Sequence, residues 1–499
     1  MATEIELKYF VLEQNVAEQI SQLLSDNDIE FKTHTKQLSN CYFDTPDLAL
    51  RKLDMGLRVR TFEDNIEQTI KTSGSVVAGL HQRPEYNIDI EQTFPDLALF
   101  PKEIWREGRS PEYIQQALIS LFNTNFERIT WLVIFNGSTI ELAFDKGVIE
   151  SGGRSDEINE IEIELVEGNT KDIFALAQLL FTRIALRPGT RSKAARGYAL
   201  WRNEAFPEAQ SLEIVHQNDG VLGAFINGVG QCLNQIQCAL DTYFYSERLQ
   251  DLSTFVDAMA SLRHGFWLFN DYMSPESRRL RAELSHFIQL FSWVDNAIYL
   301  RELMNKTGNY RKKLDYSEQL VEQLKLEKRR FPDKANIAEL LYSERFNQLQ
   351  LALLNLLVSK EPSDYFCSVS ETTNLRQFAR QKLSDSLAEL HKGVVKYETM
   401  DVEQFIEQRP TLHRSLLTGA WFGSLFEGEV RQQFRMPWLD IQQGLSELQT
   451  LWIIHQQLEK LEEQPIKIVK WQHSKVENLL NALTQSIEGA LSMAAYWND

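Results

Sequence analysis

Two short segments far apart in the chain carry regularly spaced carboxylates. Residues 4–8 read Glu-Ile-Glu-Leu-Lys, and residues 160–165 read Glu-Ile-Glu-Ile-Glu-Leu. A period of two is the strand period, so an extended chain presents the charged groups on one face and the aliphatic groups on the other. A single strand of this kind is typical of a solvent-exposed sheet face. Two of them also offer clustered carboxylate oxygens, which suit a hard divalent cation such as Mg²⁺ or Mn²⁺.

Cationic side chains repeat the alternation in other segments. They are Arg58 and Arg60, Lys71, Arg83, and Arg191 and Lys193. Arg and Lys match the charge and geometry of phosphate oxygens, and like charges along one strand need counter-charges nearby. Carboxylates opposite cations therefore predict a site for a polyphosphate and its metal. Hydrolysis there needs an in-line water, charge neutralisation on the phosphoryl group, and a carboxylate that orients or deprotonates the water.

The elements that must position these groups are antiparallel strands. Before about residue 200, short alternating segments are separated by turn residues, and Asn136-Gly137 suits a tight hairpin turn. Helical patterns interrupt the strands near residues 16–24 and 170–184. We expect a barrel of about eight strands with the charged face inward, which leaves room for a small ligand. Aliphatic residues would then pack outward under the helices, namely Ile5, Leu7, Val59, Ile161 and Ile163.

The chain changes character after this region. Apolar residues recur at three- and four-residue spacing over segments such as 221–240, 276–294 and 337–358, which are too long for strands. We therefore predict an α+β domain over residues 1–202, a linker over 203–217 and an all-α bundle over 218–499.

Composition limits the class of protein. The 499 residues carry a formal net charge of −18, which disfavours a general nucleic-acid or anionic-membrane binder. The four cysteines have neither metal-ligand spacing nor the density of a disulfide scaffold, and no signal peptide or membrane-spanning run is evident. We expect a cytoplasmic protein without nucleic-acid or membrane partners.

The first 200 residues resemble the CYTH family of triphosphate tunnel metalloenzymes. Seven motifs occur in the family's order: ExExK at residues 4–8, then YFDTPD, LRVR, TIKTSG, RPEYN, EIEIEL and SKAARGY. The resemblance implies an eight-stranded antiparallel tunnel and metal-dependent hydrolysis of inorganic triphosphate to pyrophosphate and phosphate. Thiamine triphosphate and nucleoside triphosphates are alternative substrates, adenylate cyclase is an alternative activity, and a non-catalytic polyphosphate-binding module is the alternative class.

The resemblance also implies roles for individual residues. Glu4, Glu6, Asp145, Glu162 and Glu164 would be the metal ligands. Glu6 or Glu164 would orient the water, and Glu85 would hold an arginine in place. The residues that bind triphosphate oxygens would be Lys8, Arg58, Arg60, Lys71, Arg83, Arg191 and Lys193. For each cation, an internal salt bridge without substrate contact is the alternative interpretation.

The helical half resembles a CHAD domain. A CYTH domain followed by a CHAD domain is the layout of bacterial inorganic triphosphatases. CHAD domains are described as modules that bind polyphosphate through histidines and basic residues. The candidates here are Arg263-His264, Arg278-Arg279-Leu280-Arg281 and His413-Arg414. Aromatic residues follow His264 where further basic residues would be expected, so a helical scaffold with solvated charges is an equal alternative.

Overall fold

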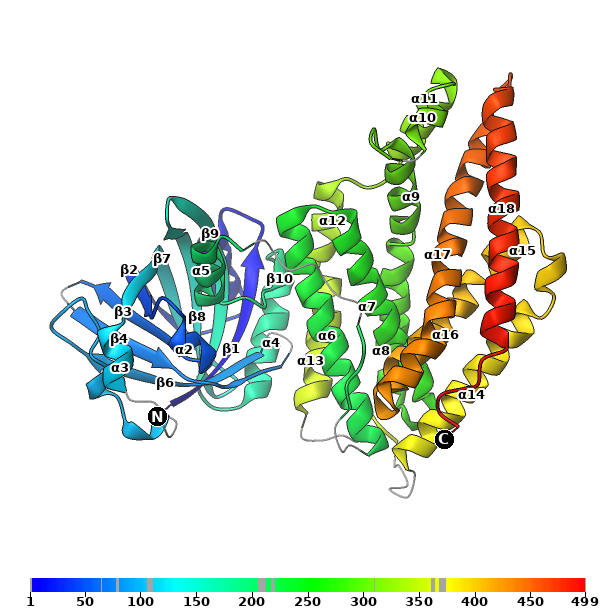
Figure 1. Ribbon diagram of the computed structural model, residues 1–499. Coiled ribbons are helices and arrows are strands. Elements are labelled where there is room, and N and C mark those ends of the chain that lie inside the picture. Colours follow the sequence, from blue (N-terminus) through cyan, green and yellow to red (C-terminus); the bar gives the residue numbers. More distant parts are fainter. Residues whose placement is uncertain are drawn as a thin grey trace. The chain divides into compact units, whose positions relative to one another are not determined.

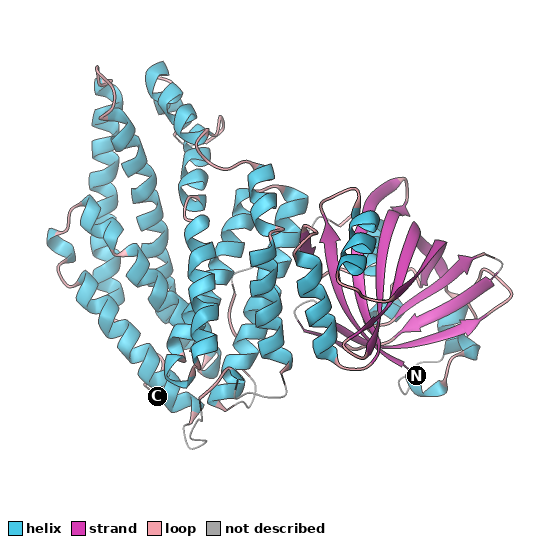
Figure 2. Ribbon diagram, turned by 180° about the vertical axis from the view of Figure 1, so that it is seen from behind, coloured by secondary structure: helices cyan, strands magenta, loops and turns pink. Residues whose placement is uncertain are grey.

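The computed structural model describes residues 2–63, 65–77, 80–105, 111–204, 212–216, 220–308, 310–359, 364–367 and 374–498. The chain divides into two compact units. One consists of Met1–Pro207 together with Ala338–Asn355, and the other of Glu208–Ile337 together with Leu356–Asp499. Figure 2 shows that the strands of the sheet lie in the first unit, whereas the second is built from helices.

The first unit contains one antiparallel sheet (Figure 1). Its strands are β1 (Ala2–Val11), β2 (Phe31–Asp44), β3 (Gly56–Phe62), β4 (Asn65–Lys71), β5 (Ser75–Val77), β6 (Leu80–Asp89), β7 (Ile119–Phe135), β8 (Ser138–Ser151), β9 (Arg154–Glu167) and β10 (Leu186–Pro188). Their order is β10-β1-β9-β8-β7-β2-β3-β4-β6-β5. The antiparallel sheet predicted from the sequence is confirmed.

Strand β1 also pairs with β6. Residues Ala2–Leu7 of β1 lie opposite Leu80–Glu85 of β6, while Glu6–Phe10 lie opposite β9. As a result, eight strands have a partner on each side among the described residues: β1 to β4 and β6 to β9. The described sheet has ten strands, two more than predicted, because β5 and β10 are three-residue segments too short to produce a sequence period.

Two tight turns fix the register of the central strands. Asn136 and Gly137 have φ angles of 52° and 85° between β7 and β8, and Gly152 and Gly153 have φ angles of 56° and 78° between β8 and β9. Positive φ at both central residues is the signature of a type I′ hairpin turn. The hairpin predicted at Asn136-Gly137 is therefore present.

Helices pack on both faces of this sheet, and the last of them lies on the face that carries the charged side chains. The two predicted ones are α1 (Val16–Asp26) and α4 (Thr170–Phe181), and the structure adds α2 (Ala49–Lys52), α3 (Pro111–Gln116) and α5 (Lys193–Arg202). Helix α1 buries Val16, Ile20, Leu23 and Leu24, the stripe expected of an amphipathic helix. Its Ser21 Oγ accepts a hydrogen bond of 3.0 Å from Trp131 Nε1 of β7.

The aliphatic residues of the alternating strands form the core beneath α1 to α4. Leu7, Val59, Ile161 and Ile163 are all buried, as predicted, and Ile5 is half-buried. The same strands therefore direct their charged side chains away from this core, because successive side chains point to opposite faces.

The described chain beyond residue 220 is helical, as predicted, and all of it except Ala338–Asn355 belongs to the second unit. The helices in this part of the chain are α6 (Val221–Ser246), α7 (Leu249–Leu268), α8 (Pro275–Leu290), α9 (Val294–Met304), α10 (Arg311–Leu314), α11 (Glu318–Lys328), α12 (Lys334–Leu341), α13 (Glu344–Val358), α14 (Leu375–Val394), α15 (Val402–Glu407), α16 (Arg409–Phe422), α17 (Gly428–Leu458) and α18 (Ile466–Leu491). The indole of Trp421 packs against Gly228 and Gly265, where a Cβ would come within 2.1 Å of it. These two glycines allow α6 and α7 to approach α16.

Two segments differ from the prediction, namely the helix expected over residues 337–358 and the linker expected over residues 203–217. The predicted helix over 337–358 is broken between α12 and α13, where Ser343 Oγ accepts a hydrogen bond of 3.3 Å from Phe346 N. Of the predicted linker, residues 205–211 and 217 lie outside the described residues. Residues 212–216 belong to the helical unit, in which Ile214 N donates to Ala420 O at 2.9 Å. No helix in the described ranges is apolar over a length that could cross a bilayer.

Candidate active site

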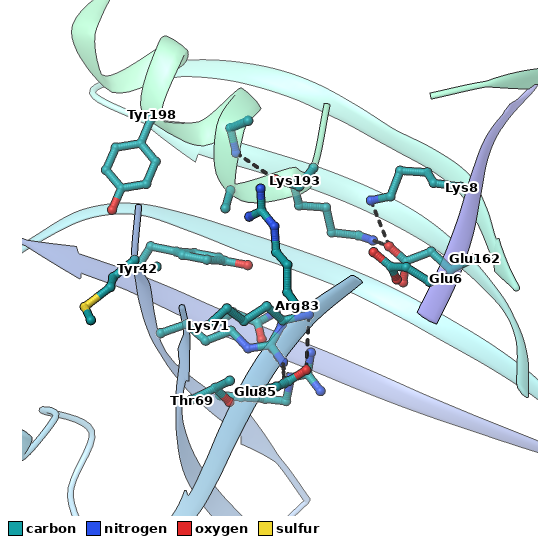
Figure 3. A pocket seen from close by; sticks show the side chains of 18 of the residues that line it. Glu6, Lys8, Tyr42, Thr69, Lys71, Arg83, Glu85, Glu162, Lys193 and Tyr198 are labelled. Carbon is teal, nitrogen blue, oxygen red and sulfur yellow. Dashed lines mark hydrogen bonds and ion pairs between the residues drawn. The ribbon is translucent and has the colours of Figure 1, made fainter. Parts of the chain in front are cut away.

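Charged side chains from the strands and from α5 line one cavity of about 620 Å³. They form two groups in Figure 3. The carboxylates of Glu6 and Glu162 lie beside Lys8 and Lys193, whereas Lys71 and Arg83 lie around Glu85. The cavity therefore has an acidic side with lysines among its carboxylates, and a second side dominated by cations.

The cationic side is organised around Glu85 of β6. Its Oε1 lies 3.3 Å from Arg58 Nη2 of β3, and its Oε2 lies 3.2 Å from Lys71 Nζ of β4. Burial alone would raise the pKa of Glu85, but the charges of Lys71 and Arg58 outweigh it and keep that pKa below its ordinary value. Glu85 is thus an ionised carboxylate that holds Arg58 and Lys71 together.

Positive charge is in excess on this side. Burial, followed by the nearby guanidinium groups of Arg58 and Arg128, lowers the pKa of Arg60 to about 9. Arg60 Nε donates to Asn40 Oδ1 at 2.8 Å, a neutral acceptor. Among the described residues, the buried Nε of Arg83 has no hydrogen-bond partner. An anion with several oxygens would relieve this repulsion and accept the remaining hydrogen bonds.

The acidic side is built from three adjacent strands. Glu141 of β8, Glu164 of β9 and Glu6 of β1 lie opposite one another in register, and all three line the cavity. Like charges directly opposite on neighbouring strands are destabilising. Arg128 Nη1 lies 4.0 Å from Glu141 Oε1, and a cation bound at this row would add to that counter-charge.

A second group of carboxylates is more deeply buried, with Asp145 and Glu160 fully buried. Asp145, Glu160 and Glu162 each place an oxygen within 4.8 Å of the others. Lys8 Nζ lies 2.9 Å from Glu160 and 2.8 Å from Glu162, and Lys193 Nζ lies 2.6 Å from Asp145 and 3.0 Å from Glu162. Lysine ammonium groups therefore already balance the charge of this group.

Arg128 of β7 adds a further positive charge beside this group of carboxylates. Its guanidinium lies 2.6 Å from Asp145 and 2.5 Å from Glu162, and it also lines the cavity. Burial alone would raise the pKa values of Glu160 and Glu162, but the positive charges of Lys193 and Lys8 outweigh this effect. They lower the pKa of Glu160 to about 2 and the pKa of Glu162 well below its ordinary value. Conversely, the carboxylates raise the pKa values of Lys8 and Lys193 against the effect of burial. Both glutamates and both lysines are therefore charged at neutral pH.

Helix α5 positions Lys193. Ser192 Oγ caps the helix by accepting from Ala195 N at 3.2 Å, so Lys193 is its first residue. Gly197 lies against the Phe122 ring of β7, where a Cβ would come within 2.1 Å of the ring. Close packing of this helix end against the sheet brings the lysine to the carboxylates.

Most of the predicted site residues line the cavity, and the others lie beside it or away from it. Those that line the cavity are Glu6, Lys8, Arg58, Arg60, Lys71, Arg83, Glu162, Glu164 and Lys193. Asp145 is fully buried beside it and contacts Lys193 and Arg128. Arg191 precedes α5 and is not among the lining residues. The backbone of Glu4 pairs with Arg83, but its side chain lies outside the described ones.

Arg128 and Glu141 were missing from the predicted site. The two tight turns contained the signal, because pairs counted outward from a two-residue turn give the register. Counting from Asn136-Gly137 places Arg128 opposite Asp145, and counting from Gly152-Gly153 places Glu141 opposite Glu164, as observed.

Comparison with known proteins identifies two domain families. Residues 2–198 match the CYTH domain and residues 229–459 match the CHAD domain. An inorganic triphosphatase from Haemophilus influenzae is 39% identical over 205 residues, which are 40% of this chain and 55% of that protein. The chain thus spans about half the length of this curated relative.

Solved structures show more distant likeness. A Hippeastrum protein described as having a dominant triphosphatase activity is 18% identical, with a TM-score of 0.29, over 40% of this chain and 95% of its own. The CHAD domain from Ricinus communis is also 18% identical, with a TM-score of 0.40, over 58% of this chain and 96% of its own.

Proposed function

The chain carries a CYTH domain followed by a CHAD domain, and from this premise we propose that it hydrolyses inorganic triphosphate to pyrophosphate and phosphate with the aid of Mg²⁺ or Mn²⁺. The observation that carries the proposal is the cavity in which Arg58, Arg60, Lys71 and Arg83 lie on one side and a row of carboxylates lies on the other. Cations match the oxygens of the anion, and carboxylates suit the metal that accompanies it. The 39% identity to an inorganic triphosphatase supports the same substrate.

We further propose that the eight strands with two partners close into a tunnel around the cavity. The support is the pairing of β1 with β6 over six residue pairs, which joins the two ends of the strand order. A closed wall of strands would hold a flexible linear anion extended between the two charged groups. Such positioning lowers the entropy lost on reaching the transition state.

The carboxylates of the acidic side can hold a divalent metal, which at Asp145 and Glu162 would compete with the lysine and arginine groups described above. We propose Glu4, Glu6, Asp145, Glu162 and Glu164 as its ligands, and of these Glu6, Glu162 and Glu164 line the cavity. Carboxylate oxygens are the donors that Mg²⁺ and Mn²⁺ prefer. When bound, the metal supplies neutralisation of negative charge on the phosphoryl oxygens.

The side chains of the protein would bind the substrate and orient the water. Arg58, Arg60, Lys71 and Arg83 bind phosphate oxygens, and Lys8 and Lys193 reach the cavity from the acidic side. Glu6 or Glu164 orients the attacking water, since both carboxylates face the cavity opposite the cations. A carboxylate so placed can accept the proton that the water loses.

A substrate panel tests this function. Purified full-length protein is supplied with inorganic triphosphate, thiamine triphosphate or ATP, each with Mg²⁺, Mn²⁺ or a chelator, and the released phosphate and any cyclic nucleotide are measured. We expect metal-dependent release that is fastest from inorganic triphosphate. Calorimetric binding of triphosphate without turnover under any metal would instead establish a binding module.

Substitution of the water-orienting candidates tests the site. Glu6→Gln and Glu164→Gln each keep the side-chain shape while removing the charge and the basicity, so turnover should fall by about two orders of magnitude or more. Glu157→Gln is the matched control, because Glu157 lies on the same strand as Glu164 but is exposed and outside the cavity. Unchanged turnover in both cavity variants would contradict the assignment.

We also propose that the helical unit binds polyphosphate. The support is a cluster of cationic and imidazole groups, in which burial and then Arg281 and Arg414 lower the pKa of Arg263. Burial and the neighbouring His413 and Arg263 lower the pKa of His264 to about 3. Binding of long-chain polyphosphate to the full chain should weaken in Arg263→Ala and Arg281→Ala but not in Arg330→Ala, because Arg330 lies outside the candidate residues and is paired with Glu327 at 3.1 Å. Equal binding by all variants would place polyphosphate elsewhere.

A further inference from the structure

The motif YFDTPD at residues 42–47 has no part in the proposed reaction, yet it borders the sheet cavity. It ends β2 and leads into α2. Tyr42 of β2 and Arg51 of α2 line the cavity, together with Tyr198 of α5. In Figure 3, Tyr42 and Tyr198 lie on one side of the cavity and Glu6 lies on the other. These residues are therefore separate from the carboxylates proposed to hold the metal.

The carboxylate of Asp44, within this motif, is fully buried and joins α2 to α5. Its Oδ1 accepts hydrogen bonds from Thr45 N at 2.7 Å and from Leu50 N at 2.8 Å. Its Oδ2 accepts from Arg51 N at 3.0 Å and from Tyr198 Oη at 3.2 Å. Burial and then the negative charge of Asp44 raise the pKa of Tyr198, so the hydroxyl keeps its proton and donates. One carboxylate therefore fixes the backbone of Arg51 relative to the Tyr198 side chain.

The side chain of Arg51 is held at the cavity by this arrangement. Its guanidinium lies over the Tyr198 ring, 4.5 Å from the ring centroid, in a cation–π contact. Within the part of the chain that the structure describes, Arg51 forms no ion pair, whereas the neighbouring Lys52 lies 3.0 Å from Asp47. A guanidinium attracted to a ring face still offers its N–H donors to phosphate oxygens.

We propose that Arg51 is a further substrate-binding residue, which contacts the phosphate at the end of the triphosphate away from the metal, and that Asp44 positions it. The inference rests on the proposed triphosphatase function, in which Glu6 or Glu164 acts at the metal end. Because the far phosphate lies away from the bond that breaks, the contact is about equally strong in the bound substrate and in the transition state. Its loss should therefore raise KM rather than lower kcat.

Isothermal titration calorimetry and steady-state kinetics on the full-length protein test the contact. Arg51 is exposed, so Arg51→Met should fold normally. It should weaken binding of inorganic triphosphate about tenfold and raise KM by a similar factor, while kcat stays within about twofold. Arg51→Lys, which keeps the charge but not the planar fork, should have an intermediate affinity. Titrations with a chelator in place of the metal need no turnover, so they report on Arg51 even where the substrate panel finds no hydrolysis.

Lys52→Met is the matched control. It removes an equal charge one residue away, but Lys52 is exposed, pairs with Asp47 and is not among the residues that line the cavity. The affinity and KM of this variant for triphosphate should equal those of the wild type.

A double-variant comparison tests the positioning role of Asp44. Asp44→Asn keeps the side-chain shape but removes the charge, so it should weaken triphosphate binding in the otherwise unchanged protein. Added to Arg51→Met it should cause little further loss, because Asp44 acts through Arg51. Tyr198→Phe removes only the hydroxyl that donates to Asp44, and it should show the same non-additive pattern even where Asp44→Asn fails to fold.

Three outcomes would overturn the proposal. Wild-type affinity in Arg51→Met, or equal weakening by Lys52→Met, would mean that Arg51 makes no direct contact with the anion. A fall in kcat at unchanged KM would contradict the assignment to the far phosphate. Additive losses in the double variants would remove Asp44 as the positioning residue.

Discussion

At the scale of single residues, the acidic side of the sheet cavity depends on Arg128. Its planar guanidinium donates from Nε and Nη2 to the two oxygens of Asp145, at 2.6 Å each, and from Nη2 to Glu162 as well, and an ammonium group cannot reproduce this two-pronged geometry. Replacing it by Met leaves two carboxylates with less counter-charge in a largely buried place. We expect Arg128→Met to destabilise the sheet unit by about 3 to 5 kcal/mol. Hydrogen exchange measured by mass spectrometry on peptides of β7, β8 and β9 checks this.

The control is an exposed ion pair in the same unit. Lys52 lies 3.0 Å from Asp47, and their side chains are 58% and 71% exposed. Exposed pairs contribute little, so Lys52→Met should leave exchange in these strands unchanged. Similar exchange in the two variants would mean that Arg128 is not needed to balance the acids.

The depressed pKa values of the buried glutamates predict acid sensitivity. The pKa of Glu160 falls from an ordinary value near 4.5 to about 2 on folding. The resulting stabilisation is fully present above pH 4.5 and is lost as the pH falls toward 2, because the unfolded chain then binds protons that the folded chain does not. The urea midpoint of the sheet unit should fall over this range, and Glu160→Gln should show a flatter dependence between pH 4.5 and 3. Identical slopes for both proteins would contradict the assigned cause.

At the scale of elements, the sequence predicts strands better than the placement of α5. The alternation and the two tight turns give the strands and their register, because both are local. The contact of Gly197 with Phe122 joins residues far apart in the chain, and no local pattern predicts it. For this reason the sequence predicts Lys193 as a site residue but does not predict the helix packing that positions it.

Gly197→Ala tests whether the close approach of α5 positions Lys193. The added Cβ would lie 2.1 Å from Phe122 Cε2, so the helix must move away from the sheet. We expect a loss of about 1 to 3 kcal/mol in stability and a fall of about tenfold or more in phosphate release, since small displacements of binding groups are costly. Gly489→Ala in α18 is the control, because a Cβ there meets no atom within 4 Å. Unchanged release with Gly197→Ala would show that α5 tolerates displacement.

At the scale of the whole molecule, the sequence predicts two domains but not the membership of α13. Its apolar stripe indicates a buried face without naming the partner that covers it. Most of this helix belongs to the sheet unit, since Ala338–Asn355 cluster with Met1–Pro207. The buried Asn347 donates from Nδ2 to the carbonyl of Leu186 in β10. The first structural unit therefore requires a segment from far along the chain.

A chain that ends at Glu204 tests this requirement. It lacks Tyr342 and Asn347. The buried Arg187 would keep its contact with the Phe10 ring at 4.9 Å but lose its contact with the Tyr342 ring. The carbonyl of Leu186 would lose the hydrogen bond from Asn347. We expect lower solubility and faster hydrogen exchange in β1 and β10, with less change in β3 and β4. Asn347→Ala in the full chain should shift exchange in β10 in the same direction by about 1 to 2 kcal/mol. A truncated chain whose β1 and β10 exchange as slowly as in the full protein would mean that the sheet is stable without α13. Because β1 carries Glu6 and Lys8, the predicted loosening should also reduce phosphate release by the truncated chain.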